Sequence, residues 1–283
     1  MGSALPTLQV SQWHASLELQ FTQRPSGCRL IKADRKGPLS VQRPFYPEGP
    51  ELAHCYLLHP PGGLVSGDLL AISAHCNEGS QVLITTPGAG RAYRARETQT
   101  QQRQRQRFTV EQNASLEWLP METIVYPGAN LHSETDFHLS ANSSLIAWDV
   151  ICLGLPASQQ AFERGQFCQR TRVFQDGRLS LIDRFALNAP SPVQSQAAGL
   201  NGRTVLGLLI VGPFSDSTSI DELTDTLRDR ELPLTCTRIE QWLVVRYLGN
   251  SAFDARKAFE ICWRHCRPRL LNRTACAPRI WAT

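Results

Sequence analysis

Glycine, proline and asparagine interrupt the first two-thirds of this sequence so often that no long regular element fits between them. The interruptions are Gly62-Gly63, Gly67-Asp68, Asn77-Glu78-Gly79, Pro87-Gly88 and Pro127-Gly128. Short apolar runs lie between them at 69–72 and 82–84, and at 17–21 apolar and polar residues alternate with the two-residue period of a half-buried strand. No convincing 3.6-residue period occurs before about residue 215. The pattern predicts a mainly β fold with a body of many short strands.

The segment 204–283 has a different pattern. Leu223 and Leu227 stand at helical spacing, and Phe259, Cys262 and Trp263 fall along one side of a second helical pattern that we expect to end near Pro268. The expected order is a strand at 204–211, a helix at 221–230, strands at 234–238 and 242–248, and a helix at 253–265. We therefore expect two domains: a β-rich body over 1–203, and a small α+β module with a C-terminal tail over 204–283.

Composition restricts the class of protein. The sequence has 283 residues, 42% of them hydrophobic, which suffices for one large β domain with an appendage. No apolar run reaches the ~18 residues of a membrane span, and residues 1–10 lack the basic and apolar parts of a secretory signal. We expect a cytoplasmic protein without membrane association. Its nine cysteines contain no C-x-x-C pair, so we expect reduced and mostly buried thiols.

One short segment alternates arginine with glutamine. Arg103, Arg105 and Arg107 occupy one face of an expected strand, and three glutamines occupy the other face. A solvated strand or an edge strand kept soluble by charge explains the pattern. The alternative is a nucleic-acid-binding β module, but the run contains no aromatic residue on which bases could stack. We expect no nucleic-acid partner.

A loop rich in proline and glycine precedes the strand that starts near residue 69. It runs from His59 to Asp68, and its end would place the Asp68 carboxylate at the mouth of the β body. The alternative is a turn aspartate bonded to its own backbone. A hydrolase using His59, Asp68 and Glu122 is a further alternative, although the sequence has no G-x-S-x-G or H-E-x-x-H motif. A Glu117 and Glu122 acid-base pair is disfavoured, because an offset of five puts them on opposite faces of a regular strand.

The helix at 253–265 and the C-terminal tail raise two further questions. Cys262 and Cys266 lie four residues apart and so face one way, which suits a soft metal, but core packing explains them better because no second ligand cluster is visible. Ile280 and Trp281 stand unusually close to the C-terminus. They are expected to be buried, either against the β body or in a partner protein.

Taken in order, several segments resemble the UreD family of urease accessory proteins, also called UreH. The matching segments lie at 37–47, 58–68, 85–94, 116–120, 126–129, 148–154, 267–268 and 278–283. Each segment alone is weak, but their order and spacing span almost the whole chain. The resemblance implies a β body wound in a helical manner, with a smaller helical part.

The resemblance also implies a function. Proteins similar to UreD bind apo-urease and recruit a UreF-type adaptor, which carries a UreG-type GTPase. They are not enzymes and hold no permanent cofactor, but transient Ni²⁺ is thought to pass through them to the urease active site. The carboxylates implicated in that passage match Asp68, Asp149 and Asp183. The family's C-terminal segment matches Arg279 and Trp281. We expect these two residues to anchor the tail, either at an interface with the UreF-type partner or against the body.

The chain departs from the family pattern at two places. Relatives tend to have Arg-Pro-x-x-Gly-Glu where this chain has Leu155-Pro156-Ala157-Ser158-Gln159-Gln160, so no role of that Arg or Glu is carried over. Gly90 stands where the family has a small polar residue. The general chemistry still suits a metal conduit, because Ni²⁺ binds His and Cys cages tightly, whereas isolated carboxylates, hydroxyls and carbonyls release it.

Overall fold

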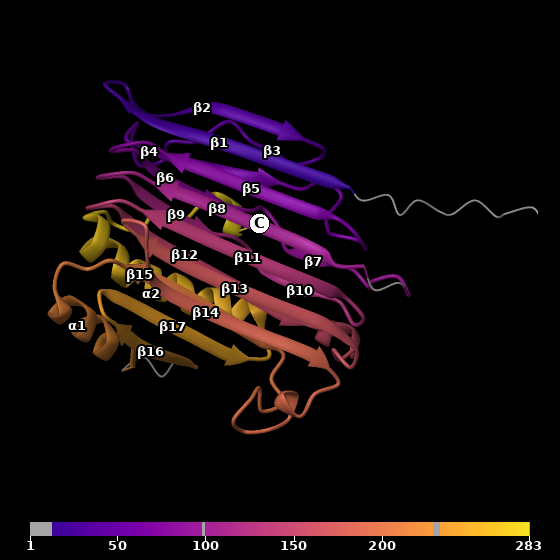
Figure 1. Ribbon diagram of the computed structural model, residues 1–283. Coiled ribbons are helices and arrows are strands. Elements are labelled where there is room, and N and C mark those ends of the chain that lie inside the picture. Colours follow the sequence, from indigo (N-terminus) through magenta and orange to yellow (C-terminus); the bar gives the residue numbers. More distant parts are fainter. Residues whose placement is uncertain (1–12, 98–99, 229–232, 283) are drawn as a thin grey trace, which may run out of the picture.

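The computed structural model describes residues 13–97, 100–228 and 233–282 as two β-sheets packed face to face, with two α-helices (Figure 1). Residues 1–12, on which the expectation about a secretory signal rests, lie outside the described residues. The first sheet has seven strands, in the order β14 (Arg178–Ala189), β13 (Gly165–Gln175), β11 (Asn130–Leu139), β8 (Gln102–Val110), β5 (Leu69–Cys76), β1 (His14–Arg24) and β2 (Gly27–Lys36).

The second sheet has ten strands. Its main order is β16 (Leu234–Ile239), β17 (Trp242–Gly249), β15 (Val205–Gly212), β12 (Ser144–Leu153), β9 (Ser115–Leu119), β6 (Gln81–Thr85), β4 (Leu52–Leu58) and β3 (Ser40–Val41), and β10 (Thr123–Val125) and β7 (Gly90–Ala92) join beside β12. The helices are α1 (Ser217–Arg228) and α2 (Ala252–Leu271), with 3-10 turns η1 (Pro156–Ser158), η2 (Pro192–Gln194) and η3 (Arg279–Ala282).

Between β4 and β13 the chain passes back and forth between the two sheets. The strands β4, β6, β9 and β12 pair in parallel in the ten-stranded sheet, and the intervening strands β5, β8, β11 and β13 pair in parallel in the other. Each return to a sheet therefore adds the next neighbouring strand. This arrangement confirms the predicted helically wound, many-stranded β body.

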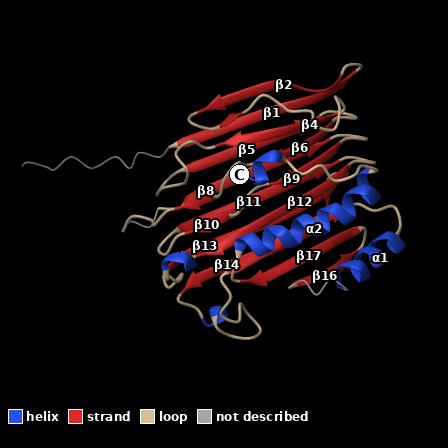
Figure 2. Ribbon diagram, turned by 180° about the vertical axis from the view of Figure 1, so that it is seen from behind, coloured by secondary structure: helices blue, strands red, loops and turns tan. Residues whose placement is uncertain are grey.

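The two sheets differ in what covers their outer faces, and their sequences reflect this. Helix α2 lies against the outer face of the ten-stranded sheet (Figure 2), so β12 is buried on both sides and has an almost continuous apolar sequence. Strand β11 of the seven-stranded sheet instead alternates between buried and partly exposed residues. A strand with one solvated face needs apolar residues only at every second position.

The segment 204–283 contains the expected order of strand, helix, strand, strand and helix. Its strands continue the ten-stranded sheet, because β15 pairs antiparallel with β12 and with β17. Helix α2 extends further than the expected range 253–265 and includes Pro268. The helix continues because Arg267 is held by buried carboxylates, and a proline near a helix end removes only one backbone hydrogen bond.

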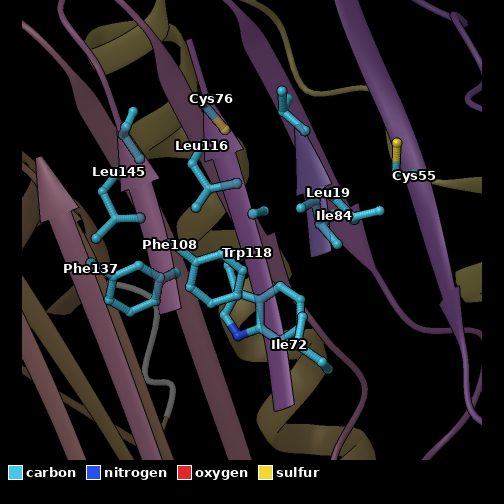
Figure 3. Close-up of a cluster of buried hydrophobic side chains, with 14 of the residues drawn as sticks. Leu19, Cys55, Ile72, Cys76, Ile84, Phe108, Leu116, Trp118, Phe137 and Leu145 are labelled. Atoms are coloured by element: carbon cyan, nitrogen blue, oxygen red, sulfur yellow. The ribbon is translucent and has the colours of Figure 1, made fainter. Parts of the chain in front are cut away.

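The main core lies between the two sheets, and Figure 3 shows part of it. The Phe108 ring lies 5.2 Å from the ring of Phe137 on the same sheet and 4.8 Å from Trp118 on the opposite sheet. Cys55 and Cys76 belong to this core, and six of the nine cysteines are buried, in agreement with the expectation of buried thiols. Within the described residues, no helix is long and apolar enough to cross a membrane.

Candidate functional site

One part of the gap between the sheets is polar, under the strands β8, β11 and β13, although apolar cores lie beside it. Strand pairing aligns Gln106, Thr135, Thr171 and Asp183 across β8, β11, β13 and β14 of the seven-stranded sheet. The next rung along the strands holds Gln104, Ser133 and Gln169. We call these two rungs, together with Asp149 on the facing sheet, the polar layer. Side chains two residues apart share a face of a strand, so all members of the two rungs point to the same side of the sheet.

Asp149 of β12 is the carboxylate at the centre of the polar layer. It accepts a short hydrogen bond from Gln169 of the opposite sheet. Burial raises the pKa of Asp149 to about 7. The hydrogen bonds from the Val150 amide and Gln169 favour the ionised form and offset part of this rise. This carboxylate therefore changes its charge near neutral pH.

Two hollows meet at Asp149. One is a cavity of about 330 Å³ that Gln104, Gln106 and Asp149 line from the polar layer. The other, of about 10 Å³, lies between Asp149, Thr135 and Thr171 and has room for about one water molecule. The larger cavity reaches the surface at Pro60 and Gly88, which are exposed.

The two tight loops noted in the sequence form the outer part of the larger cavity. His59, Pro60 and Gly62 come from the loop before β5, and Thr86 to Ala89 come from the loop after β6, with Gly90 at the start of β7. Burial lowers the pKa of His59, although the nearby Asp68 carboxylate acts in the opposite direction. A histidine with a lowered pKa is neutral at pH 7 and has a nitrogen lone pair free to approach a metal ion.

The three predicted aspartates do not form one cluster. The Asp68 carboxylate accepts a hydrogen bond from the Val65 amide at 2.8 Å, which is the turn arrangement considered as the alternative, and Asp68 does not line the cavity. Asp183 lies at the edge of the polar layer and forms an ion pair with Arg246 of β17, across the gap between the sheets. Among the described residues, no group of three or more His, Cys, Asp or Glu side chains could hold a metal ion together.

The structure separates Glu117 from Glu122. The Glu117 carboxylate accepts hydrogen bonds from Trp263 and Arg267 of α2, whereas Glu122 lies 2.8 Å from the Nε of Arg256. Each carboxylate is therefore held in its own ion pair, and the structure gives no support to an acid-base pair.

The C-terminal features pack against the body of the protein. Trp281 donates a hydrogen bond from Nε1 to the Thr85 hydroxyl at 3.0 Å and lies 5.2 Å from the Trp148 ring. Arg279 is exposed beside it, in η3. Cys262 and Cys266 of α2 are buried in the core beneath that helix, which agrees with the packing explanation.

Comparison with known proteins decides the family. The sequence profile described as UreD urease accessory protein matches residues 14–282. The chain is 45% identical to the urease accessory protein UreD of Marinomonas sp. (strain MWYL1), covering 99% of this chain and 93% of the relative. It is 39% identical to the UreD protein of Klebsiella pneumoniae, covering 100% of this chain and 99% of the relative. The chain belongs to the UreD family of urease accessory proteins.

Membership of the UreD family gives the protein a role in urease maturation and favours neither alternative considered from the sequence. Arg103, Arg105 and Arg107 are exposed, as a solvated strand requires, but β8 is a central strand of its sheet rather than an edge strand. The hydrolase alternative needs Glu122 near His59, and Glu122 is instead paired with Arg256 and does not line the cavity that His59 lines.

Sequence reasoning misses most of the polar layer of this UreD-family protein. The glutamines of β8 stand out only as the second face of an alternating strand, yet they turn toward the gap and Gln106 accepts a hydrogen bond from Thr135 at 2.8 Å. The usable signal is that uncharged polar residues recur at alternate positions in three strands: Gln104 and Gln106, Ser133 and Thr135, and Gln169 and Thr171. Only knowledge of which strands pair brings them together.

Proposed function

We propose that this UreD-family protein is a non-catalytic scaffold, working in the cytoplasm, that binds apo-urease, recruits a UreF-type adaptor with its UreG-type GTPase, and conducts Ni²⁺ to the urease active site. The observation that carries the proposal is the polar layer, in which Asp149 stands where two hollows meet inside an otherwise apolar sandwich. An apolar core has no structural need for such a layer, and burying a carboxylate there lowers stability.

The ligand chemistry of the layer suits passage rather than storage. The layer offers amides and hydroxyls and, where the two hollows meet, the Asp149 carboxylate, and apolar residues such as Leu70 and Ile72 complete the lining of the larger cavity. Oxygen ligands of this kind hold Ni²⁺ less tightly than a His or Cys cage. Conduction requires binding that is favourable enough for entry and weak enough for release. Ni²⁺ is the cargo in this proposal and displaces the proton of Asp149.

The other two predicted aspartates extend this proposed path at its ends. Asp68 acts electrostatically on His59, which lines the outer part of the cavity. Asp183 continues the rung of Gln106, Thr135 and Thr171 to the edge of the sheet, where Arg246 neutralises it. A cation leaving at this edge would compete with Arg246 for the Asp183 carboxylate.

The test is nickel content. Asp149→Asn preserves the shape of the side chain and its contact with Gln169 while removing the charge. We expect urease co-expressed with this variant to contain much less nickel per active site, measured by mass spectrometry, while the accessory complex still co-purifies. Glu163→Gln, an exposed acid-to-amide change, is the matched control. Normal nickel content with Asp149→Asn, and also with Asp68→Ala and Asp183→Ala, would rule out the path.

A further inference from the structure

The outer face of the seven-stranded sheet carries a strong excess of positive charge. Among the described elements, α2 lies on the opposite side of the molecule, against the other sheet, as Figures 1 and 2 show from the two sides. The residues that alternate with the polar layer point outward here. They form three rungs, which we call the arginine face: Arg103, His132 and Cys168; Arg105, Glu134, Arg170 and Arg184; and Arg107, Asp136, Arg172 and Ile182.

The charge of the whole protein is concentrated on this face. Six arginines stand against two carboxylates, which leaves an excess of four positive charges. That excess equals the formal net charge of +4 of the full sequence, so the remaining acidic and basic residues balance one another. A concentrated charge of one sign attracts partners of the opposite sign and speeds their association.

The two carboxylates form a central column between columns of arginine. Glu134 lies 2.6 Å from Arg170 and 3.7 Å from Arg105, and Asp136 receives two hydrogen bonds from Arg172, at 2.8 and 2.7 Å. These pairs hold part of the face rigid.

The remaining arginines are open to a ligand. Among the described residues, Arg107 and Arg184 have no carboxylate partner, and the Arg103 guanidinium donates to the uncharged side chain of Gln101. Burial, followed by the charge of Arg103, lowers the pKa of His132. His138, the next outward residue of β11 after Asp136, borders the face, and burial followed by the charge of Arg107 lowers its pKa in the same way. Both histidines are therefore neutral at pH 7 and leave the arginines as the cationic groups of the face.

We infer that the arginine face is a docking surface for an acidic face of one protein partner, which under the proposed function is apo-urease. A protein surface can present carboxylates to Arg103, Arg107 and Arg184 and a basic group to the central column. A nucleic-acid backbone is negative throughout, and it would meet Glu134 and Asp136 in the middle of the face. Leu179 and Ile182, about half exposed on β14, add apolar area of the kind that protein interfaces use.

The experiment compares two triple variants with the same change in net charge. The face variant is Arg103→Glu, Arg107→Glu and Arg184→Glu, which leaves no buried carboxylate without its partner. The control variant is Arg24→Glu, Arg43→Glu and Arg203→Glu, at exposed positions away from the arginine face. Binding to apo-urease is measured at several salt concentrations, and circular dichroism verifies that each variant folds. The inference rests on the proposed function, because apo-urease is the binding partner used in this measurement.

We expect the face variant to bind apo-urease at least about ten-fold more weakly, with a smaller dependence on salt, and the control variant to bind like the wild type. Equal binding by both variants, or equal loss in both, would overturn the inference and leave the proposed function standing. A second arm uses a short poly-L-glutamate peptide and a DNA duplex of matched charge. If the wild type fails to bind apo-urease, that result contradicts the proposed function alone, and this second arm then decides the inference. Loss of peptide binding only in the face variant supports the inference. Tighter binding to DNA than to the peptide, or no binding to the peptide, overturns it.

Discussion

The guanidinium group of Arg267, on α2, donates from Nε to Glu117 Oε2 at 3.0 Å and so ties the helix to the centre of the ten-stranded sheet. The same group reaches Glu48 at 2.7 and 2.8 Å. Burial alone would raise the pKa of Glu48, but the hydrogen bonds from His54 and Arg267 lower it to about 2. Arg267 is fully buried, so it compensates two carboxylates that have little access to water.

Arg267→Ala is expected to destabilise the protein by about 3–5 kcal/mol, because removing one partner of a buried ion pair leaves the others uncompensated. Equilibrium unfolding in urea measures the change. Arg264→Ala, on the same helix, removes an exposed pair with Glu260 and should cost no more than about 0.5 kcal/mol. Equal effects of the two substitutions would show that Arg267 does not fasten α2 to the sheet.

Substitutions of Trp281 should measure how much the C-terminal turn contributes to the stability of the fold. Trp281→Phe keeps most of the packing against Trp148 but loses the hydrogen bond to Thr85, so we expect a cost of about 1 kcal/mol. Trp281→Ala also loses the ring and should cost about 2–4 kcal/mol. Urea unfolding measures both changes.

Arg279→Ala should leave the free energy of unfolding within about 0.5 kcal/mol of the wild type, because its side chain is exposed. If Arg279 anchors a UreF-type adaptor, the same variant should co-purify with less adaptor. Undiminished co-purification by a folded Arg279→Ala variant would remove Arg279 from the interface.

The fold could be predicted from sequence because its local signals agree with its tertiary structure. Alternation at residues 17–21, in β1, and frequent turns reflect a sheet with one solvated face, and the order of elements after residue 204 follows from periodicity. The extent of α2 could not be predicted, because the ion pairs of Arg267 with Glu48 and Glu117 join residues far apart in sequence and override the usual effect of Pro268.

The site is less accessible from sequence than the fold. Asp149 is found through its family motif, but its raised pKa depends on burial between two sheets, which one strand sequence does not reveal. The alternation of glutamine and arginine in β8 can be recognised from the sequence of that strand, but it does not show which strands lie beside β8. Pairing with β5 and β11 makes β8 a central strand, and this turns its glutamines into the lining of a cavity and its arginines into part of a charged face.

The pKa of Asp149 predicts a pH-dependent stability difference. The pKa of about 7 in the folded protein lies above the ordinary aspartate value of 3.8, so folding favours the protonated acid. The wild type should therefore lose stability relative to Asp149→Asn as pH rises from about 4 to about 7, by up to about 1.4 kcal/mol for each pH unit in that interval. The difference should level off above about pH 7, where the carboxyl group is ionised in both the folded and the unfolded protein.

Urea unfolding of the wild type and Asp149→Asn at intervals from about pH 5 to about pH 8.5 tests this expectation. Glu163→Gln provides the baseline for an acid-to-amide change at an exposed site. A stability difference that is flat across this range would mean that the Asp149 carboxylate is well hydrated, and the proposed path would then lose its titrating group.

Making the polar layer apolar should stop nickel passage without unfolding the protein. Thr135 donates a hydrogen bond to Gln106 at 2.8 Å, so the double change Gln106→Leu with Thr135→Val removes both partners and leaves neither half of that bond unsatisfied. The larger cavity would then lose an amide from its lining, and a hydrated cation entering it would have fewer oxygen ligands. We expect the nickel content of co-expressed urease to fall while the accessory complex still assembles. Thr109→Val, on the outward face of the same strand, is the control that should leave nickel content unchanged. Unimpaired nickel loading by the folded double variant would show that the ion takes another route.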